Sequence, residues 1–296
     1  MMSASDIDLD PERVTVLTGP TAGGKSALAL ALGACVNAVI INADASQLYD
    51  CLAVVSARPT PADAAAVPHR LYGVLAGDDV CTAARWAEMA KAEIAAARNG
   101  GLHPIVVGGT GLYLVALVHG LAPVPEIDAG VRAAVRALST DAARAALLQE
   151  DPASAARLMP ADRQRTLRAL EVARSSGRTL GDWQQQREGG IGEAAVQGLV
   201  VERPRADLHA RAEARLDAML AAGALAEVAA LLALNLPAEA PVMKALAVPQ
   251  LAAHLAGAIG LDQAMAQALF ATRQYQKRQA TWARGQVPGW QRVILG

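Results

Sequence analysis

The chain has few cysteines, few lysines, a single phenylalanine and no long apolar run, and two of these shortages exclude classes of protein. Its three cysteines, Cys35, Cys51 and Cys81, stand far apart without a Cys-x-x-Cys pair. That spacing fits neither a zinc site nor a disulfide framework, and indicates a reducing compartment. The longest strongly apolar run without charge or proline, residues 27–41, is too short to span a bilayer. We therefore expect a soluble, cytoplasmic protein with no membrane partner. The scarcity of lysine and phenylalanine carries no functional indication.

Net charge is also nearly absent, since 27 basic residues face 28 acidic ones. This balance argues against a protein that coats nucleic acid through a strongly basic surface. The N-terminus carries four acids before Arg13, unlike a secretory or transit peptide. A local basic face is still compatible with the composition. Residues 163–178 hold five arginines and one acid, and the 34 residues after Asp262 hold five basic residues and no acid.

What is present is the pattern of a globular α/β protein, with 53% hydrophobic and 19% charged residues in 296 positions. Short β-branched runs alternate with longer segments of helical periodicity. We predict strands at 14–18, 39–41, 105–107, 198–202 and 293–295. We predict helices at 26–32, 85–98, 111–118, 205–234 and 262–285. Such alternation predicts a parallel sheet flanked by helices.

Two breaks divide this pattern, a proline-rich one at 121–125 and a glycine-rich one at 189–192. Between them, residues 129–187 show only helical periodicity. We therefore predict an α/β core formed by residues 1–120 and 200–296, with an all-helical insertion domain at 121–199. Nothing in the sequence indicates an oligomer, and we expect a monomer.

Eight consecutive residues after the first predicted strand fit the phosphate-loop pattern G-x-x-x-x-G-K-[ST] and precede a predicted helix. They are Gly19, Pro20, Thr21, Ala22, Gly23, Gly24, Lys25 and Ser26. In such a loop the backbone N–H groups and the helix N-terminus attract phosphate, the lysine neutralises it, and the Ser26 hydroxyl can bind Mg²⁺. The loop alone does not distinguish a nucleoside triphosphate from another diphosphate. An ATP-binding kinase that uses Asp44 as its acid, and a non-catalytic nucleotide-dependent RNA-binding switch, remain alternatives at this point.

Six segments in order resemble the tRNA dimethylallyltransferase (isopentenyl-tRNA transferase) family. They are residues 19–29, 42–49, 68–71, 107–113, 168–172 and 271–282. The resemblance spans roughly residues 13 to 290 and implies a P-loop NTPase-like core. It also implies the reaction: transfer of a dimethylallyl group from its diphosphate to N6 of adenine 37 in tRNA, with release of diphosphate. The phosphate loop would then hold the diphosphate leaving group, together with Mg²⁺ on Ser26.

The resemblance also suggests the reacting residues. Asp44 follows a predicted strand and would act as general base on the adenine amine; as alternatives it would bind magnesium or cap a helix. Thr110 would contact the amine and the leaving group, and could also cap the helix at 111–118. Arg211 and Arg215, one helical turn apart, are candidates for the diphosphate pocket. The alternative for this arginine pair is a surface ion-pair face with neighbouring acids.

For the tRNA anticodon stem-loop, the resemblance implies contacts from both predicted domains. The residues are Asp44, Ala45, Ser46, Gln47, Gln164, Arg165, Thr166, Leu167, Arg168 and Lys244. The arginine-rich insertion agrees with this role, although a solvated basic face is the alternative. Two segments depart from the family pattern: residues 55–59 lack its glycine, and residues 247–250 lack its glycine, tyrosine and basic residue.

Overall fold

A computed structural model describes residues 6–296. The chain forms two compact units. The first contains the residues up to Leu117 together with Gly192–Gly296, and the second contains Val118–Ile191. Each unit has a hydrophobic core of its own. The chain therefore leaves the first unit once and returns to it once.

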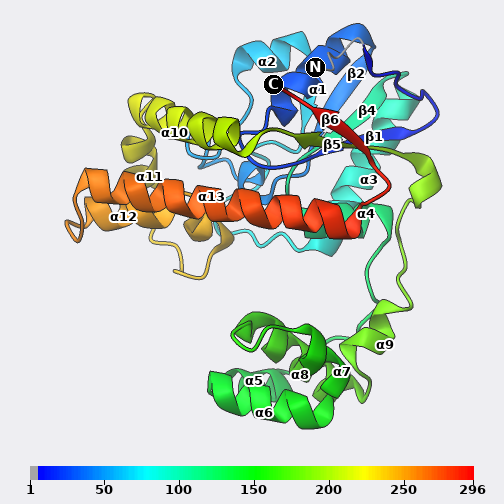
Figure 1. Cartoon of the computed structure of the whole chain (residues 1–296), viewed down its shortest axis with the longest axis vertical. Helices are drawn as coiled ribbons and strands as arrows, with labels where there is room; N and C mark the ends of the chain where they lie inside the picture. Colours follow the sequence, from blue (N-terminus) through cyan, green and yellow to red (C-terminus); the bar gives the residue numbers. More distant parts are fainter. Residues whose placement is uncertain (1–5) are drawn as a thin grey trace. The chain divides into compact units, whose positions relative to one another are not determined.

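The first unit is built on a six-stranded sheet in which all neighbouring strands pair in parallel, in the order β3-β2-β4-β1-β5-β6. The strands are β1 (Val14–Thr18), β2 (Ala38–Asn42), β3 (His69–Arg70), β4 (His103–Val107), β5 (Val196–Glu202) and β6 (Gln291–Ile294). The predicted parallel sheet flanked by helices is confirmed (Figure 1). The two-residue edge strand β3 was not predicted, because so short a segment has no detectable alternation.

Helices of the first unit pack on this sheet and beside it (Figure 1). They are α1 (Lys25–Cys35), α2 (Pro61–Ala66), α3 (Ala83–Asn99), α4 (Gly111–Val118), α10 (Arg205–Ala221), α11 (Ala224–Ala233), α12 (Val248–Leu255) and α13 (Leu261–Gln286). Short 3₁₀ turns add to them, among them η2 (Ala45–Leu48), η3 (Glu193–Ala195) and η4 (Pro241–Lys244).

The single helix predicted at 205–234 is wrong. The structure has α10 and α11 there, bent by 66° at a short break. Gly223 adopts a left-handed conformation at the break, with φ of 97°. That conformation is a common helix terminator because glycine has no Cβ to oppose it.

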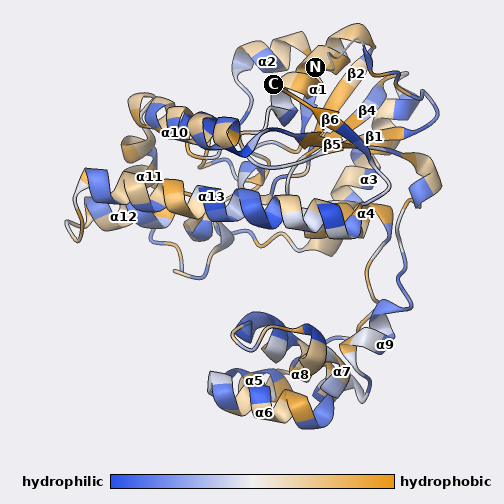
Figure 2. Cartoon of the chain, in the orientation of Figure 1, coloured by the Kyte–Doolittle hydropathy of each residue, from blue (hydrophilic) through white to orange (hydrophobic). Residues whose placement is uncertain are grey.

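The sheet is buried on both faces, which explains its continuous apolar strands. Ile40 and Ile105 pack with Leu28 and Leu32 of α1 in one core cluster. Their neighbours along the strands are equally buried, as expected for a parallel sheet covered on both sides. Figure 2 shows these central strands as mostly hydrophobic, whereas the C-terminal half of α13 is mostly hydrophilic.

The second unit contains helices only, in the part of the chain that the structure describes. They are α5 (Ala129–Arg136), α6 (Thr140–Glu150), α7 (Pro152–Arg157), α8 (Arg163–Ser176) and α9 (Leu180–Gln184). Val135, Leu147 and Leu170 are fully buried at the centre of its core. Over residues 6–296, no single helix is long and apolar enough to cross a membrane; α10 and α11 reach that measure only as a bent pair.

Candidate active site

The phosphate loop connects β1 to α1 and curls around the start of the helix. Gly24 stands before the first turn with φ of 102°, a conformation that a side chain would strain. The first amides of α1 have no intrahelical acceptor and are available to an anion. The Lys25 amine donates hydrogen bonds to the carbonyls of Gly19 (2.9 Å) and Pro20 (3.0 Å). Burial lowers the pKa of Lys25 to about 8; the charge of Asp44 opposes this shift and that of Arg215 adds to it.

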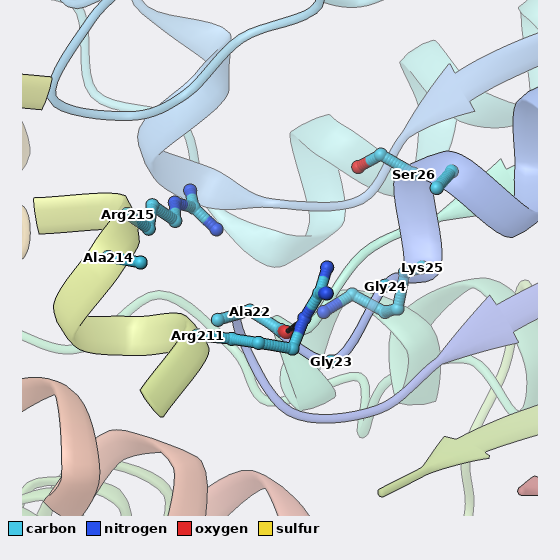
Figure 3. Close-up of a pocket in the computed structure, with 9 residues that line it drawn as sticks. Ala22, Gly23, Gly24, Lys25, Ser26, Arg211, Ala214 and Arg215 are labelled. Carbon is cyan, nitrogen blue, oxygen red and sulfur yellow. Dashed lines mark hydrogen bonds between the residues drawn. The ribbon is translucent and has the colours of Figure 1, made fainter. Parts of the chain in front are cut away.

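Two arginines of α10 face the phosphate loop across a cavity of about 430 Å³ (Figure 3). Arg211 donates from Nε to the carbonyl of Ala22 (3.0 Å). Arg215 donates to the hydroxyl of Thr21 (3.3 Å) and to the carbonyl of Ser56 (3.3 Å). Both guanidinium groups thus lie beside the cationic loop, although like charges repel. An arrangement that gathers two arginines and a lysine around one cavity suits a polyanion.

The alternative of a surface ion-pair face is not what the structure has. Glu213 pairs with Arg273 of α13 at 3.9 Å. Among residues 6–296, neither Arg211 nor Arg215 forms an ion pair with Glu213 or Asp217. Burial also lowers the pKa of Arg215, opposed by the charge of Asp44. The two guanidinium groups therefore remain available to a ligand.

Asp44 stands directly after β2 and shows one of the alternatives expected for it. Its Oδ1 accepts hydrogen bonds from the backbone N–H (3.0 Å) and the hydroxyl (2.7 Å) of Ser46, so it caps the turn η2. Its own N–H donates to the side chain of Asn42 (2.8 Å). These bonds fix the carboxylate while Oδ2 has no hydrogen bond to any described residue. Capping and a reactive role are therefore compatible in this carboxylate.

Thr110 lies at the carboxyl end of β4, beside the end of β2. Its hydroxyl oxygen accepts a hydrogen bond from the N–H of Ala45 (3.0 Å), so it ties the two strand ends together. Its carbonyl accepts from Tyr113 (2.9 Å), at the start of α4. Tyr275 borders the same cavity as Thr110. Burial, helped by the charge of Asp44, raises the pKa of Tyr275 to about 12.

The predicted reacting residues line one cavity of about 260 Å³. Its walls include Thr21, Asp44, Thr110, Arg215, Lys244 and Arg278. Arg215 borders both this cavity and the one at the phosphate loop. Of the residues predicted for tRNA, the structure brings Asp44, Ala45, Ser46 and Lys244 to this cavity. The side-chain amide of Gln47 instead donates to two carbonyls, those of Ser56 and Ala57, both at 2.9 Å.

Sequence reasoning missed two glutamines of α13 that reach the phosphate loop. The N–H of Thr21 donates to Oε1 of Gln279 (2.7 Å), and Nε2 of Gln276 donates to the carbonyl of Thr21 (3.0 Å). Nε2 of Gln279 donates in turn to the carbonyl of Gly109 (3.1 Å). A signal was present: both glutamines occupy the buried stripe of the helix, where apolar residues are expected.

In the helical unit, the predicted RNA residues divide by exposure along α8. Gln164, Arg165 and Arg168 are exposed. Thr166 is buried, and Leu167 packs against the core of the unit. The latter two side chains therefore serve packing.

The basic charge of α8 is largely paired within the unit. Arg174 makes a bidentate pair with Glu150, and Arg168 lies 3.7 Å from the buried Glu171. Arg165 lies 3.4 Å from Asp162, but 76% of its side chain is exposed. Glu150 and Asp162 lie outside the window in which charge was counted from the sequence. The freely available positive charge is therefore smaller than that count.

The residues present fit a magnesium ion held jointly with a diphosphate, though not an ion held by protein alone. Over residues 6–296 there is no group of three or more His, Cys, Asp or Glu placed to hold a metal. The Ser26 hydroxyl is exposed at the start of α1 and forms no hydrogen bond to the described residues. Mg²⁺ commonly takes one or two protein oxygens together with phosphates and water. This donor set matches that mode.

Comparisons with known proteins point to one family. The model of the IPP transferase family matches residues 47–286, a range that begins after the phosphate loop. The chain is 54% identical to the tRNA dimethylallyltransferase of Sphingopyxis alaskensis, covering 95% of this chain and 93% of that protein. It is 51% identical to that of Rhodospirillum centenum, covering 96% and 92%.

Solved structures give the same answer. A tRNA isopentenylpyrophosphate transferase from Bacillus halodurans superposes with a TM-score of 0.69 at 25% identity, covering 96% of this chain and 90% of that one. A eukaryotic dimethylallyltransferase solved as it acts on tRNA superposes with a TM-score of 0.83 at 22% identity, covering 96% and 74%. The latter similarity concerns the fold alone.

Proposed function

Because the chain belongs to the tRNA dimethylallyltransferase (IPP transferase) family, we propose that it transfers the dimethylallyl group of dimethylallyl diphosphate to N6 of adenine 37 in tRNA and releases diphosphate. One observation carries this proposal: Arg215 borders both the cavity at the phosphate loop and the cavity that holds Asp44 and Thr110. A diphosphate in the first cavity therefore places its allylic carbon toward the second. An acceptor amine near Asp44 then meets that carbon.

The phosphate loop stabilises the leaving group. As the allylic C–O bond breaks, negative charge grows on the diphosphate oxygens. The free amides at the start of α1, Lys25, Arg211 and Arg215 are placed before the reaction to receive that charge. Donors fixed in advance at developing charge supply a large part of many enzymes' rate enhancement. Ser26 would hold Mg²⁺, which when bound neutralises diphosphate charge.

Asp44 and Thr110 act on the acceptor. An exocyclic adenine amine is a poor nucleophile, so the carboxylate of Asp44 takes its proton as the N–C bond forms. The free Oδ2 of Asp44 is the atom available for this step, since Oδ1 is occupied by Ser46. Thr110, held by Ala45, orients the amine beside it. Adenine must leave the anticodon-loop stack to enter the cavity, at a cost of a few kcal/mol.

RNA contacts come from both units. Lys244 and Arg278 at the cavity are cations for the backbone of the anticodon loop. In the helical unit, Gln164, Arg165 and Arg168 offer exposed polar groups for the stem. Thr166 and Leu167 are left out, because their side chains pack inside the unit. The cytoplasmic location and the monomeric state predicted from the sequence stay predictions.

The proposal is tested by incubating unmodified tRNA that carries A36-A37-A38 with labelled dimethylallyl diphosphate and Mg²⁺. We expect label in tRNA at position 37. Asp44→Asn keeps an oxygen for the Ser46 bonds but removes the base, so transfer should fall by about 10²–10⁴-fold with tRNA affinity within several-fold. The same substitution at Asp78, which is exposed and borders neither cavity, is the matched control and should retain wild-type activity. Absence of label with the wild type, together with ATP turnover on a small acceptor, would refute the proposal.

A further inference from the structure

We propose that Gln279, assisted by Gln276, is a positioning residue that fixes the distance between the phosphate loop and the strand-end loop carrying Thr110. This inference rests on the proposed function, because it concerns the position of the leaving group relative to the acceptor amine. The role is indirect, because neither glutamine borders the cavity of Asp44 and Thr110.

Gln279 makes one hydrogen bond to each of the two loops. Its Oε1 accepts from the N–H of Thr21 in the phosphate loop, at 2.7 Å. Its Nε2 donates to the carbonyl of Gly109, at 3.1 Å. Gly109 directly precedes Thr110 in the chain. One planar amide therefore spans from the diphosphate-binding loop to the catalytic strand end.

Gln276 also binds Thr21, through the Thr21 carbonyl. Its Nε2 donates to the carbonyl of Thr21 (3.0 Å) and to the carbonyl of Leu208 in α10 (3.2 Å). The Thr21 hydroxyl is held by Arg215. All three polar groups of Thr21 are thus occupied by α10 and α13. Its N–H is therefore engaged by Gln279, just as the N–H of Gly23 is engaged by the carbonyl of Pro20 (3.1 Å).

Gln276 and Gln279 are buried, and the backbone at Gly109 packs closely against Gln279. Gln276 and Gln279 are 4% and 6% exposed, and burying amides at this depth is favourable only when they are hydrogen-bonded. Gln279 uses both polar atoms of its amide, whereas Gln276 uses Nε2 and its Oε1 has no partner among the described residues. A side chain at position 109 would collide with Nε2 of Gln279. The close approach of Gly109 to the helix therefore depends on the absence of a Cβ. A purely packing role would be filled by leucine or methionine without burying polar atoms.

The consequence for the reaction is geometric. Thr110 is already tied to Ala45, next to Asp44. Gln279 adds the link from this acceptor side to the donor side. Misplacing reacting groups by about 1 Å can cost a factor of 100 in rate. Loss of the link should therefore impair the chemical step and diphosphate binding, while binding of tRNA is retained.

The experiment compares Gln279→Met with Gln274→Met in the full-length protein. Gln274 lies on the same helix but is exposed, so the same substitution there is the matched control. For Gln279→Met we expect kcat to fall by about 10- to 100-fold, and KM for dimethylallyl diphosphate to rise several-fold. We expect KM for tRNA to stay within twofold. Gln274→Met should match the wild type in all three constants.

A purely structural role for Gln279 gives a different result. Part of the protein would be unfolded, so the apparent kcat per total protein would fall, while KM for dimethylallyl diphosphate, which the folded fraction sets, would keep its wild-type value. That outcome, or wild-type constants for Gln279→Met, would overturn the inference. Gln276→Met, which leaves both bonds of Gln279 in place, should fold and show the same split with a smaller loss.

The proposed function can fail separately. If the wild type transfers no dimethylallyl group, titration of diphosphate into the wild type, Gln279→Met and Gln276→Met still tests the positioning of the phosphate loop. We then expect weaker diphosphate binding in both variants and unchanged binding in Gln274→Met. Equal binding by all four proteins would overturn the inference independently of the activity.

Discussion

At the scale of single residues, the Lys25 amine is expected to change its protonation when the phosphate loop is filled. Burial lowers its pKa to about 8, and the amine donates to two loop carbonyls. Negative charge beside it favours the protonated form and raises this pKa. Near pH 8 the free protein holds less than a full proton at this site. Diphosphate binding should therefore take up protons there, and its affinity should fall as the pH rises above about 8.

Calorimetry of diphosphate binding in buffers of different ionisation enthalpy measures this uptake. Lys25→Met removes the amine but leaves the protonation of the ligand itself, so the difference between the two proteins isolates Lys25. We expect that difference to be clear at pH 8 and to vanish near pH 6, where the amine is fully protonated with or without ligand. Identical uptake by the wild type and Lys25→Met at pH 8 would show that this amine keeps its proton throughout.

At the scale of elements, a carboxylate of α11 holds the segment that walls the reacting cavity. Glu227 accepts three backbone hydrogen bonds, from the N–H groups of Ala53 (2.6 Å), Val54 (2.8 Å) and Val55 (2.7 Å). Hydrogen bonds to a charged group contribute about 1.5–3 kcal/mol each, and are costly to lose where the partners stay buried. Glu227→Gln keeps the size but not the charge. We expect it to lower the free energy of unfolding by about 2 kcal/mol in urea titrations.

Glu213→Gln is the control for this change. Glu213 sits in an exposed pair with Arg273, and such pairs contribute at most about 1 kcal/mol. Its unfolding midpoint should move little. If both variants lose the same stability, the three backbone bonds of Glu227 contribute no more than a surface contact.

The helix α8 supplies a second prediction at this scale. Arg165 is 76% exposed, whereas Arg174 is held by Glu150 in two hydrogen bonds. We expect Arg165→Ala to weaken tRNA binding and to reduce the slope of log affinity against log salt by about 0.7 per lost phosphate contact. Arg174→Ala should leave the slope unchanged. If Arg165→Ala has the same slope as the wild type, the exposed face of α8 does not contact the RNA.

The elements also show which parts of the structure can be predicted from the sequence. The strand at Val14–Thr18 and the helix at Gly111–Val118 were predicted with their observed limits. The signals for both elements, the spacing of apolar residues and the flanking glycines, lie within or beside the elements themselves. The break at Gly223 was missed, because its neighbours on both sides are good helix formers. Ala247 adopts φ of 69° where the family pattern has glycine, so the backbone turn persists without the residue that usually marks it.

For the site, the phosphate loop was predicted from a local motif, and Asp44 and Thr110 were predicted from the family resemblance; contacts that depend on distant packing were missed. The phosphate loop, Asp44 and Thr110 lie at strand ends, where a parallel sheet collects its ligands. The bond between Gln279 and Thr21 joins residues 258 positions apart. The spacing of apolar residues along a helix does not predict which loop a buried glutamine will hydrogen-bond. The pairing of Arg174 with Glu150 likewise crosses two helices and cannot be read from a charge count.

At the scale of the whole molecule, the two units should respond differently to a ligand of the phosphate loop. Each has its own buried core, and every residue of the phosphate-loop cavity belongs to the first unit. We therefore expect calorimetric unfolding in two overlapping transitions rather than one two-state transition. Diphosphate with Mg²⁺ at 100 times its Kd stabilises the state that binds it by about 2.7 kcal/mol. For a unit of this size that is a rise in Tm of roughly 5–10 °C.

The transition of the helical unit, Val118–Ile191, should not move under the same conditions, because it contributes no group to the phosphate site. Lys25→Met lacks the amine at that site, so the ligand should raise the Tm of neither transition in this variant. A ligand-induced rise shared equally by both transitions, or a single transition that moves as a whole, would mean that the two units unfold as one cooperative body. The helical unit would then be stabilised by diphosphate bound in the other unit, and its affinity for tRNA should depend on whether that diphosphate is present.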